Sequence, residues 1–329
     1  MTELTPPAPY EPADIAADER PMDWARRALQ AAGVKPASPS DLPALSQLLE
    51  QAAALSAPTT ADPIRTVHHL ACTGGTLISR CIAAMPNTRL LSETDPLSTI
   101  SKHPFAPSDL VGLVRHGSRS PEQTELADLF FAGFEKLRAQ SQATGHHLVL
   151  REHNHSLFHT GNSIARRPGL LDLLSEHLAP LANNGAPNAR VLSLVTVRHP
   201  IESYLSVVHN KWHRQFKPSN LEEYARRYHA FLDRHDSLPM LRYESFVADP
   251  STTMKTVCDI LELPFNPDFQ NLFQDIRLSG DSGRSGNVIA ARPARALTPA
   301  LRQEMTDSPA YIALCERLDY PTRIEVEQP

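Results

Sequence analysis

Residues Arg198–Ser206 read Arg-His-Pro-Ile-Glu-Ser-Tyr-Leu-Ser and directly follow the apolar run Val191–Val197. The run predicts a buried strand, and the proline that follows it predicts the start of a helix. An earlier run, Arg65–Ala71, leads into Cys72-Thr73-Gly74-Gly75-Thr76 and then into a second helical pattern. Helix N-termini bind anions because their first N–H groups lack intrahelical partners. Two such turns in one chain predict a ligand with a phosphate at each end.

Strand-like and helical patterns alternate from Ile64 onward. We predict strands over Thr66–Ala71, Arg89–Ser92, His147–Arg151, Arg190–Val197 and Pro239–Arg242. We predict helices over Gly75–Met85, Glu122–Gln142, Gly169–Leu181, Ile201–His209, Leu221–His235, Ser251–Leu261, Pro299–Met305 and Pro309–Leu318. This alternation indicates an α/β fold of three layers, with a central, mostly parallel sheet between two layers of helices. Ligands of such sheets bind beyond the carboxyl ends of the strands, where both turns fall.

Composition limits the class of protein. The chain has 329 residues, of which 41% are hydrophobic and 21% are charged, as is typical of a globular protein. The net charge of −5 argues against a nucleic-acid partner. Four cysteines without paired spacing indicate a reducing compartment, so we expect a cytoplasmic protein. The N-terminus lacks the pattern of a secretion signal, and no apolar run approaches the roughly 20 residues of a membrane span.

We expect two parts in the chain. Residues 1–62 form a Pro/Ala-rich N-terminal extension with two helices, at about Met22–Ala32 and Ser40–Leu55. Residues 63–329 form the main domain. Within it, residues 280–293 are polar and Gly-rich, and the stretch is long for a connection between elements, so we interpret it as a lid.

Each turn, taken by itself, has a simpler interpretation. Gly74, Gly75 and Thr76 fit a phosphate or sulfate cradle, but they also fit a tight turn that binds nothing. Arg198 and Ser206 can grip one phosphate from two sides, but Arg198 can equally form an ion pair with Glu202.

The chain resembles the sulfotransferases that use 3′-phosphoadenosine-5′-phosphosulfate (PAPS), of the bacterial type. Arg198, Pro200 and Ser206 match the family's second signature, which binds the 3′-phosphate. Gly75 and Thr76 match its first signature, which binds the 5′-phosphosulfate. Two further stretches, 241–250 and 261–265, look like the family's Arg-Tyr-Glu segment and its Leu-Gly-Leu-Pro-like close.

The resemblance extends in order from Ile64 to Tyr320. It implies a sulfotransferase fold related to the P-loop NTPases, with PAPS as the sulfuryl donor and adenosine 3′,5′-bisphosphate (PAP) as the product. The cofactor-binding residues that it implies are Thr73, Gly74, Gly75, Thr76, Leu77, Arg198 and Ser206. It also implies a nucleotide contact for Tyr243, and a cation from the Gly-rich loop at Arg284 or Arg292.

One position departs from the family pattern. The family usually has Lys or Arg before the Gly-Thr of the first turn, where this chain has Thr73. Sulfuryl transfer needs stabilisation of developing charge, so another cation must supply it. Arg151, at the end of a predicted strand, matches the Lys of a Lys-Thr-His segment in cytosolic sulfotransferases and is our first candidate. Arg80 is a weaker candidate, and an ion pair with a nearby acid is the simpler interpretation of Arg151.

The general base has two candidates. His153 matches the His of the same Lys-Thr-His segment, and Glu93 lies at the distance from the Gly-Thr turn where related enzymes place a catalytic Glu. We favour Glu93 slightly, although a surface acid and a satisfied polar His remain the alternatives. His153, His155 and His159 also suggest a metal site, but no clear partner set accompanies them, and we expect no metal.

These observations predict an enzyme that transfers a sulfuryl group from PAPS to a hydroxyl of an acceptor. A carbohydrate or another small metabolite is favoured as that acceptor, and neither a nucleic acid nor a membrane span is expected. The alternative is a catalytically inactive PAPS- or PAP-binding scaffold or sensor on the same fold, which Thr73 permits. A metal hydrolase built on the His cluster is a third hypothesis.

Overall fold

The computed structural model describes residues 62–98, 110–115, 117–183, 189–279, 288–291 and 295–322. These residues belong to one compact unit of the chain, Thr59–Pro329. The two helices expected at Met22–Ala32 and Ser40–Leu55, and the boundary expected at residue 62, lie outside or at the border of the described residues. They stay predictions.

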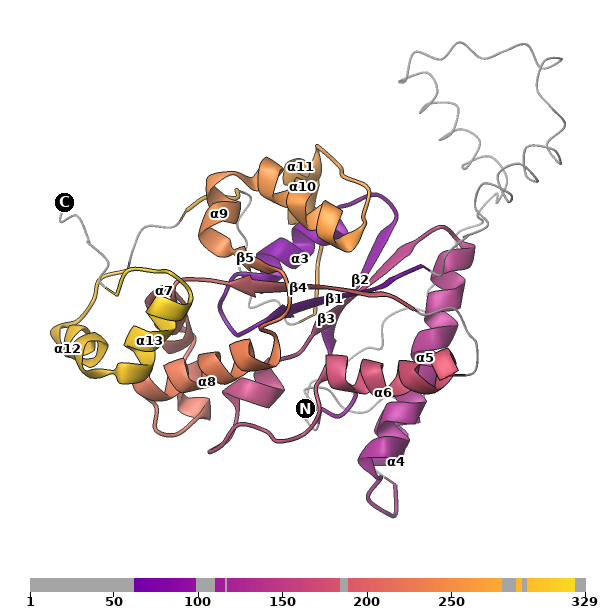
Figure 1. The fold of residues 1–329 in the computed structure, drawn as a ribbon, viewed down its shortest axis with the longest axis horizontal. Coiled ribbons are helices and arrows are strands. Elements are labelled where there is room, and N and C mark those ends of the chain that lie inside the picture. Colours follow the sequence, from indigo (N-terminus) through magenta and orange to yellow (C-terminus); the bar gives the residue numbers. More distant parts are fainter. Residues whose placement is uncertain are drawn as a thin grey trace, which may run out of the picture. The chain divides into compact units, whose positions relative to one another are not determined.

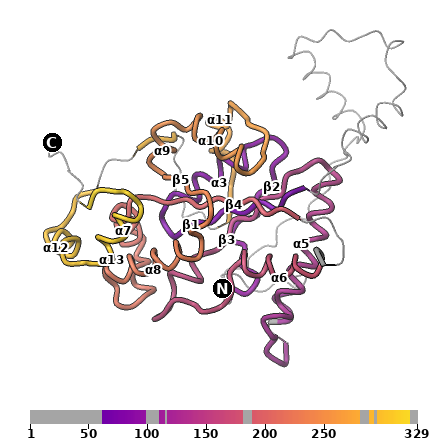
Figure 2. Tube along the Cα trace, in the orientation of Figure 1, coloured from indigo at the N-terminus to yellow at the C-terminus, as the bar shows by residue number. Residues whose placement is uncertain are grey.

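Five parallel strands form the central sheet, in the order β2-β3-β1-β4-β5. β1 lies between β3 and β4, so segments far apart in the sequence run side by side there (Figure 2). The strands are β1 (Ile64–His69), β2 (Thr88–Thr94), β3 (His147–Glu152), β4 (Val191–Val197) and β5 (Met240–Arg242). The predicted α/β class and all five predicted strands are confirmed.

Helices cover both faces of the sheet (Figure 1). One face carries α3 (Gly75–Ala83), α9 (Tyr243–Ala248), α10 (Pro250–Leu261) and α11 (Phe269–Leu272). The other carries α5 (Gln123–Ala143), α6 (Leu170–Asn183) and α8 (Leu221–Arg234). The remaining elements are α4 (Leu110–Arg115), α7 (Pro200–His209), α12 (Pro299–Asp307), α13 (Pro309–Arg317), the π-helix η1 (His155–His159) and the 3₁₀ helices η2 (Trp212–Gln215) and η3 (Phe273–Asp275).

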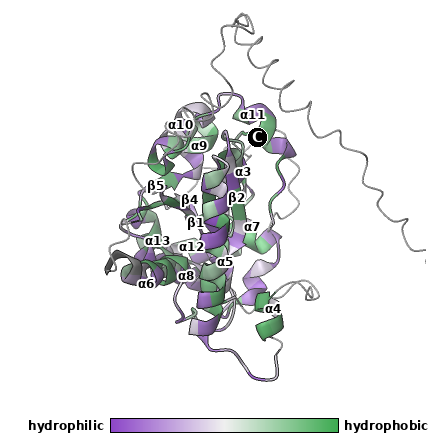
Figure 3. Cartoon of the chain, turned by 90° about the vertical axis from the view of Figure 1, so that its right-hand side faces the viewer, coloured by the Kyte–Doolittle hydropathy of each residue, from purple (hydrophilic) through white to green (hydrophobic). Residues whose placement is uncertain are grey.

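Alternation along the strands sends neighbouring side chains into different hydrophobic clusters on the two faces of the sheet. On β3, Leu148 and Leu150 pack against α5 and α6, whereas Val149 between them packs against α3 and α10 on the other face. α5 shows hydrophilic and hydrophobic residues along its length, as expected of a helix with one face on a sheet (Figure 3). The three-layer arrangement that the sequence predicted is therefore present.

Several helices begin with a capping side chain followed by a proline. Asp249 caps α10 and accepts a hydrogen bond from the Thr252 N–H at 3.0 Å, with Pro250 next in the chain. Thr298 and Ser308 cap α12 and α13 in the same way. Side-chain caps satisfy N–H groups that the helix itself leaves unpaired. This local chemistry is why the starts of the C-terminal helices could be predicted closely.

Two buried arginines tie the layers together. Arg65, in β1, is 2% exposed and donates to the Leu261 carbonyl oxygen at 2.6 Å, at the end of α10. Arg227, in α8, is fully buried and donates to the carbonyl oxygens of Phe158 and Gly161 at 3.0 Å each. Arg227 thus fixes the segment after η1 against α8.

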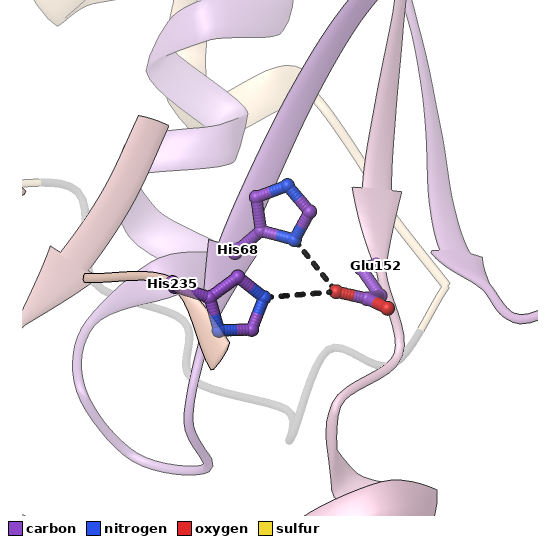
Figure 4. Close-up of side chains that lie close together, drawn as sticks. All are labelled: His68, Glu152 and His235. Carbon is purple, nitrogen blue, oxygen red and sulfur yellow. Dashed lines mark hydrogen bonds and ion pairs between the residues drawn. The ribbon is translucent and has the colours of Figure 1, made fainter. Parts of the chain in front are cut away.

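A buried network joins β1, β3 and α8 just behind the carboxyl ends of the strands (Figure 4). Glu152 Oε2 accepts from His68 Nδ1 at 2.6 Å and lies 3.5 Å from His235 Nε2. His68 Nε2 lies 2.8 Å from the Thr66 hydroxyl, which in turn lies 2.8 Å from that of Ser193.

The protonation states follow from these contacts. Because a carboxylate only accepts, His68 Nδ1 carries the proton that faces Glu152, and Nε2 accepts from Thr66. Burial lowers the pKa of His68 despite that carboxylate. Burial by itself would raise the pKa of Glu152, but hydrogen bonds from His235 and His68 outweigh it and hold that pKa below its usual range. Glu152 is therefore an anion in the folded chain, next to Arg151.

We expect the folded chain to lose stability as the pH falls below about 6.5. Burial lowers the pKa of His159 well below its usual value, as it lowers that of His68, so both stay neutral when folded but take up protons when unfolded. The stability that these two neutral histidines contribute is complete above the pKa of histidine in the unfolded chain, and it is lost on acidification. Glu152, whose folded pKa is also lowered, adds to the loss below about pH 4.3.

Urea unfolding at about pH 7.5 and about pH 5.5 tests this expectation. His159→Phe should flatten the pH dependence by up to about 1.4 kcal/mol per pH unit. The same change at His146, which is exposed, serves as the control. Equal free energies of unfolding at the two pH values would contradict the expectation.

Candidate active site at the carboxyl edge of the sheet

The turns that follow β1, β3 and β4 meet at one edge of the sheet, because these strands are neighbours and run in the same direction. The first turn is Leu70–Gly75, the second begins at Arg198, and residue 153 follows β3. The side chains that the sequence singled out in three separate stretches therefore lie at a common edge.

The first turn is shaped by two residues with left-handed backbone. Cys72 has φ 68° and Gly74 has φ 90°. α3 begins at Gly75, and no side chain of the described residues caps it. Its first N–H groups, those of Gly75 and Thr76, therefore lack intrahelical partners and point out of the helix end, which carries partial positive charge.

Both glycines of the turn are required by close neighbours. A Cβ on Gly74 would overlap the ring of Tyr243, and a Cβ on Gly75 would overlap the imidazole of His69. The positive φ of Gly74 is also a conformation that L side chains rarely adopt. Because these two positions lack a Cβ, the rings of Tyr243 and His69 can pack directly against the turn.

Thr73 and Leu77, which the sequence placed with the cofactor-binding residues, turn their side chains inward. The Thr73 hydroxyl is fully buried and donates to the Leu70 carbonyl oxygen at 2.9 Å. Leu77 packs against the hydrophobic core between α3 and α10. Any ligand contact of these two residues must therefore come from the backbone.

Tyr243 connects the two turns. Its ring lies against Gly74 of the first turn, and the Arg198 guanidinium of the second turn lies 4.8 Å from the ring centroid. Tyr243 is the first residue of α9 and is 8% exposed. A cation over a Tyr face is attracted by the ring electrons, so this side chain fixes the positions of both turns.

Arg198 and Ser206 lie together in the second turn, as the sequence predicted. Arg198 Nη1 donates to the Ser206 hydroxyl at 3.3 Å, and Arg198 Nη2 donates to Glu202 Oε2 at 3.1 Å. The ion pair with Glu202 is thus present alongside the contact with Ser206. Arg198 Nε is buried and has no hydrogen-bond partner among the described residues.

Arg295 is a third member of this group that the sequence analysis did not single out. Its Nη1 donates to the Ser206 hydroxyl at 3.0 Å. Arg284 and Arg292, the cations expected from the Gly-rich loop, lie outside the described residues. The Ser206 hydroxyl therefore accepts from two guanidinium groups and donates to the Glu202 backbone carbonyl oxygen at 3.1 Å, while the Glu202 carboxylate pairs with Arg198.

Arg151, Glu93 and His153 form one cluster next to the first turn. Arg151 Nη2 donates to Glu93 Oε1 at 2.9 Å and to the Thr76 hydroxyl at 3.3 Å. His153 Nε2 lies 3.0 Å from Glu93 Oε2. The two candidate bases and the candidate cation are thus in contact, and Arg151 reaches the start of α3.

An irregularity in β2 aims Glu93 at this cluster. The register between β2 and β3 shifts between Leu91 and Thr94, and Glu93 has φ 62°. A positive φ in a non-glycine residue is strained, and such strain concentrates at functional sites. The bulge turns the Glu93 carboxylate toward Arg151 and His153.

His69 is a further residue of the site that the sequence analysis missed. It ends β1 and lies against Gly75. Burial lowers its pKa well below the usual value, and the nearby charges of Arg151 and His153 lower it further. A neutral imidazole therefore lies between the first turn and the Arg151 cluster.

Arg80, the weaker candidate for the missing cation, points away from the site. It donates to the carbonyl oxygens of Phe273 and Gln274 at 2.9 and 2.6 Å. The prediction that Arg80 supplies the charge is therefore not supported by the geometry, because its guanidinium holds η3 onto α3.

The three histidines that suggested a metal site stack as rings. His155 lies 5.9 Å from His153 and 4.7 Å from His159, measured between ring centroids. Within the described ranges, the group whose ligand atoms lie close enough together for a metal ion is instead His68, Glu152 and His235, within 4.8 Å of one another. In the network behind the strand ends, the Glu152 carboxylate already pairs with both histidines.

Comparisons with solved structures find sulfotransferases. The sulfotransferase domain of the curacin biosynthetic pathway is 14% identical, with a TM-score of 0.45, and covers 79% of this chain and 98% of that one. The sulfotransferase domain of the Synechococcus PCC 7002 olefin synthase is 19% identical, with a TM-score of 0.45 and coverage of 80% and 96%. Mouse sulfotransferase SULT7A1, complexed with PAP, is 10% identical, with a TM-score of 0.38 and coverage of 81% and 92%.

No curated protein matches the chain. No described helix is long and apolar enough to cross a membrane. The model of the sulfotransferase family matches residues 69–267, which is more than half of the 329 residues and includes the first turn, the Arg151 cluster, the second turn and Tyr243. The chain belongs to the sulfotransferase family.

Proposed function

We propose that this chain is a PAPS-dependent sulfotransferase that acts on a hydroxyl of a carbohydrate or another small metabolite. The observation that carries the proposal is the pair of cationic sites at the ends of two neighbouring strands, joined by Tyr243. A nucleotide with phosphate groups at both its 3′ and 5′ positions matches two such sites.

The second turn suits a phosphate dianion. Arg198 and Arg295 bring two positive charges to Ser206, and Glu202 offsets one of them. The buried Nε of Arg198 is a donor without a partner in the described part of the chain. Leaving such a donor unpaired is costly, so an anion that accepts from it would be bound favourably. We assign the 3′-phosphate to this group.

The first turn suits the other end of the nucleotide. The N–H groups of Gly75 and Thr76 face outward at the start of α3, and the Thr76 hydroxyl lies beside them. Arg151 contacts that hydroxyl and supplies the positive charge that Thr73 does not. We assign the 5′-phosphate to the helix end and the sulfuryl group to Arg151.

PAPS, when bound, supplies the activated sulfuryl group. Arg151 would neutralise the charge that develops on the sulfuryl oxygens and the leaving phosphate. Glu93 and His153 would take the proton of the acceptor hydroxyl together. Arg151 donates to Glu93, and Glu93 in turn would orient the His153 imidazole, an arrangement in which a carboxylate positions a His.

Binding of PAP, measured by calorimetry, tests the nucleotide site. We expect the wild-type chain to bind PAP, and Arg198→Ala to weaken the affinity at least roughly 30-fold, because truncating one member of a buried charge pair costs about 2 kcal/mol or more. Arg226→Ala is the control, since Arg226 is exposed on α8 and pairs only with Glu222 among the described residues. Absence of PAP binding by the wild-type chain would reject the proposal.

Transfer kinetics test the shared role of Glu93 and His153. Glu93→Gln and His153→Gln should each lower the rate of PAP release from PAPS, with a panel of hydroxyl acceptors, by roughly 10²- to 10⁴-fold. The double variant should be no slower than the worse single variant, because residues that act as a unit are not additive. If the rate losses of the two single variants multiply in the double variant, Glu93 and His153 act independently. A chain that binds PAP but releases none from PAPS would be the inactive scaffold.

A further inference from the structure

The connection between α7 and α8 carries an unusual charge. Residues 210–219 read Asn-Lys-Trp-His-Arg-Gln-Phe-Lys-Pro-Ser, with three basic residues, Lys211, Arg214 and Lys217, and no acid. The chain as a whole has 37 acidic residues against 32 Lys and Arg, and a net charge of −5. This short segment is therefore strongly positive in an acidic protein.

These basic residues are exposed and have no acidic partner in the part of the chain that the structure describes. Lys211, Arg214 and Lys217 are all exposed, and none of them forms an ion pair with an acid of the described ranges. Basic residues on either side of the connection behave differently: Arg198, just before α7, pairs with Glu202, and Arg226 and Arg227 in α8 pair with Glu222 and Glu223. Among the described residues, no acid thus neutralises the positive charge of the connection.

The connection lies beside the candidate base. Its 3₁₀ helix, η2, contacts His155 with two side chains: the Trp212 ring at 5.3 Å between centroids and Gln215 Oε1 at 2.5 Å from His155 Nε2. His155 stacks on His153, whose Nε2 lies 3.0 Å from Glu93. A chain of ring contacts therefore leads from the base to η2.

The basic residues are neighbours in the chain of the two residues that contact His155. Side chains three residues apart share a side of such a helix, so Trp212 and Gln215 face His155 together. Lys211 and Arg214 are also three residues apart, and the Arg214 N–H donates to the Lys211 carbonyl oxygen at 3.3 Å. Both side chains are exposed; Lys211 directly precedes η2 and Arg214 lies within it, next to the residues that contact His155.

We propose that the acceptor is an anion: a ring compound that carries a carboxylate, phosphate or sulfate group in addition to the hydroxyl that is sulfated. This inference rests on the proposed function. The anionic group would meet Lys211 and Arg214, and the ring would lie against Trp212. The acceptor oxygen would form a bond to sulfur as the bond between sulfur and the 5′-phosphate oxygen breaks, PAP would leave, and the hydroxyl proton would pass to Glu93 and His153.

Exposed cations of this kind act by raising the local concentration of an oppositely charged substrate and by orienting it. Their effect is screened by salt, because Lys211 and Arg214 are exposed to solvent. The proposal therefore requires a preference for anionic acceptors that weakens as the ionic strength rises, which a purely structural role of the connection would not produce.

Binding of matched probes to the PAP-loaded protein tests the proposal. Trp24→Phe leaves Trp212 as the only tryptophan, because the chain has two, so its fluorescence reports binding at η2. The probe pairs are glucuronate and glucose, glucose 6-phosphate and glucose, and 4-hydroxybenzoate and phenol. We expect at least one anionic probe to bind roughly tenfold more tightly than its neutral partner at low salt, and Lys211→Gln/Arg214→Gln to remove that preference.

Arg226→Gln, on the neighbouring helix α8, is the matched control and should keep the preference. Equal binding within every pair, no binding of any probe, or a preference that survives the double variant would overturn the proposal. Calorimetry with PAP on the same proteins separates failure of the anionic-acceptor proposal from failure of the proposed nucleotide site. Normal PAP binding without a charge preference rejects the anionic acceptor alone, whereas loss of PAP binding by the wild-type chain rejects the nucleotide site as well.

Discussion

The contact on which the candidate site depends is the Tyr243 ring held between Gly74 and the Arg198 guanidinium. It joins two turns that are more than a hundred residues apart in the chain and that follow adjacent strands. Any side chain at Gly74 would displace the ring, and the ring supports the cation. The register of β1 with β4, the absence of a Cβ and one aromatic residue thus set the spacing between the two anion-binding turns.

Positively charged side chains gather at this edge of the sheet, although the chain as a whole is acidic. Arg151, Arg198 and Arg295 are held in place by Glu93, Glu202 and Ser206. Behind them, Glu152 is buried with His68 and His235, so the strand ends are fixed by hydrogen bonds as well as by hydrophobic packing. Buried polar groups of this kind are costly unless they are satisfied, and here they position the residues that follow β1 and β3.

The sequence was sufficient to predict the strands, the layers and most of the long helices, because these elements depend on apolar runs and capping residues, which are local signals. It also brought out Arg198 with Ser206 from their spacing, and Arg151 with His153 through the resemblance to the sulfotransferase family. It could not choose between Glu93 and His153, because a bulge in β2 and the pairing of β2 with β3 decide how these side chains meet. His69 was hidden within a strand pattern, and Arg295 lies just beyond the Gly-rich stretch 280–293, in which the sequence singled out only Arg284 and Arg292.

A crystal structure of the chain with bound PAP tests the central claim most directly. The account predicts the 5′-phosphate at the N–H groups of Gly75 and Thr76 and the 3′-phosphate at Arg198, Ser206 and Arg295, with Tyr243 between them. A nucleotide bound elsewhere on the chain, or one whose phosphates touch only one of the two turns, would contradict it.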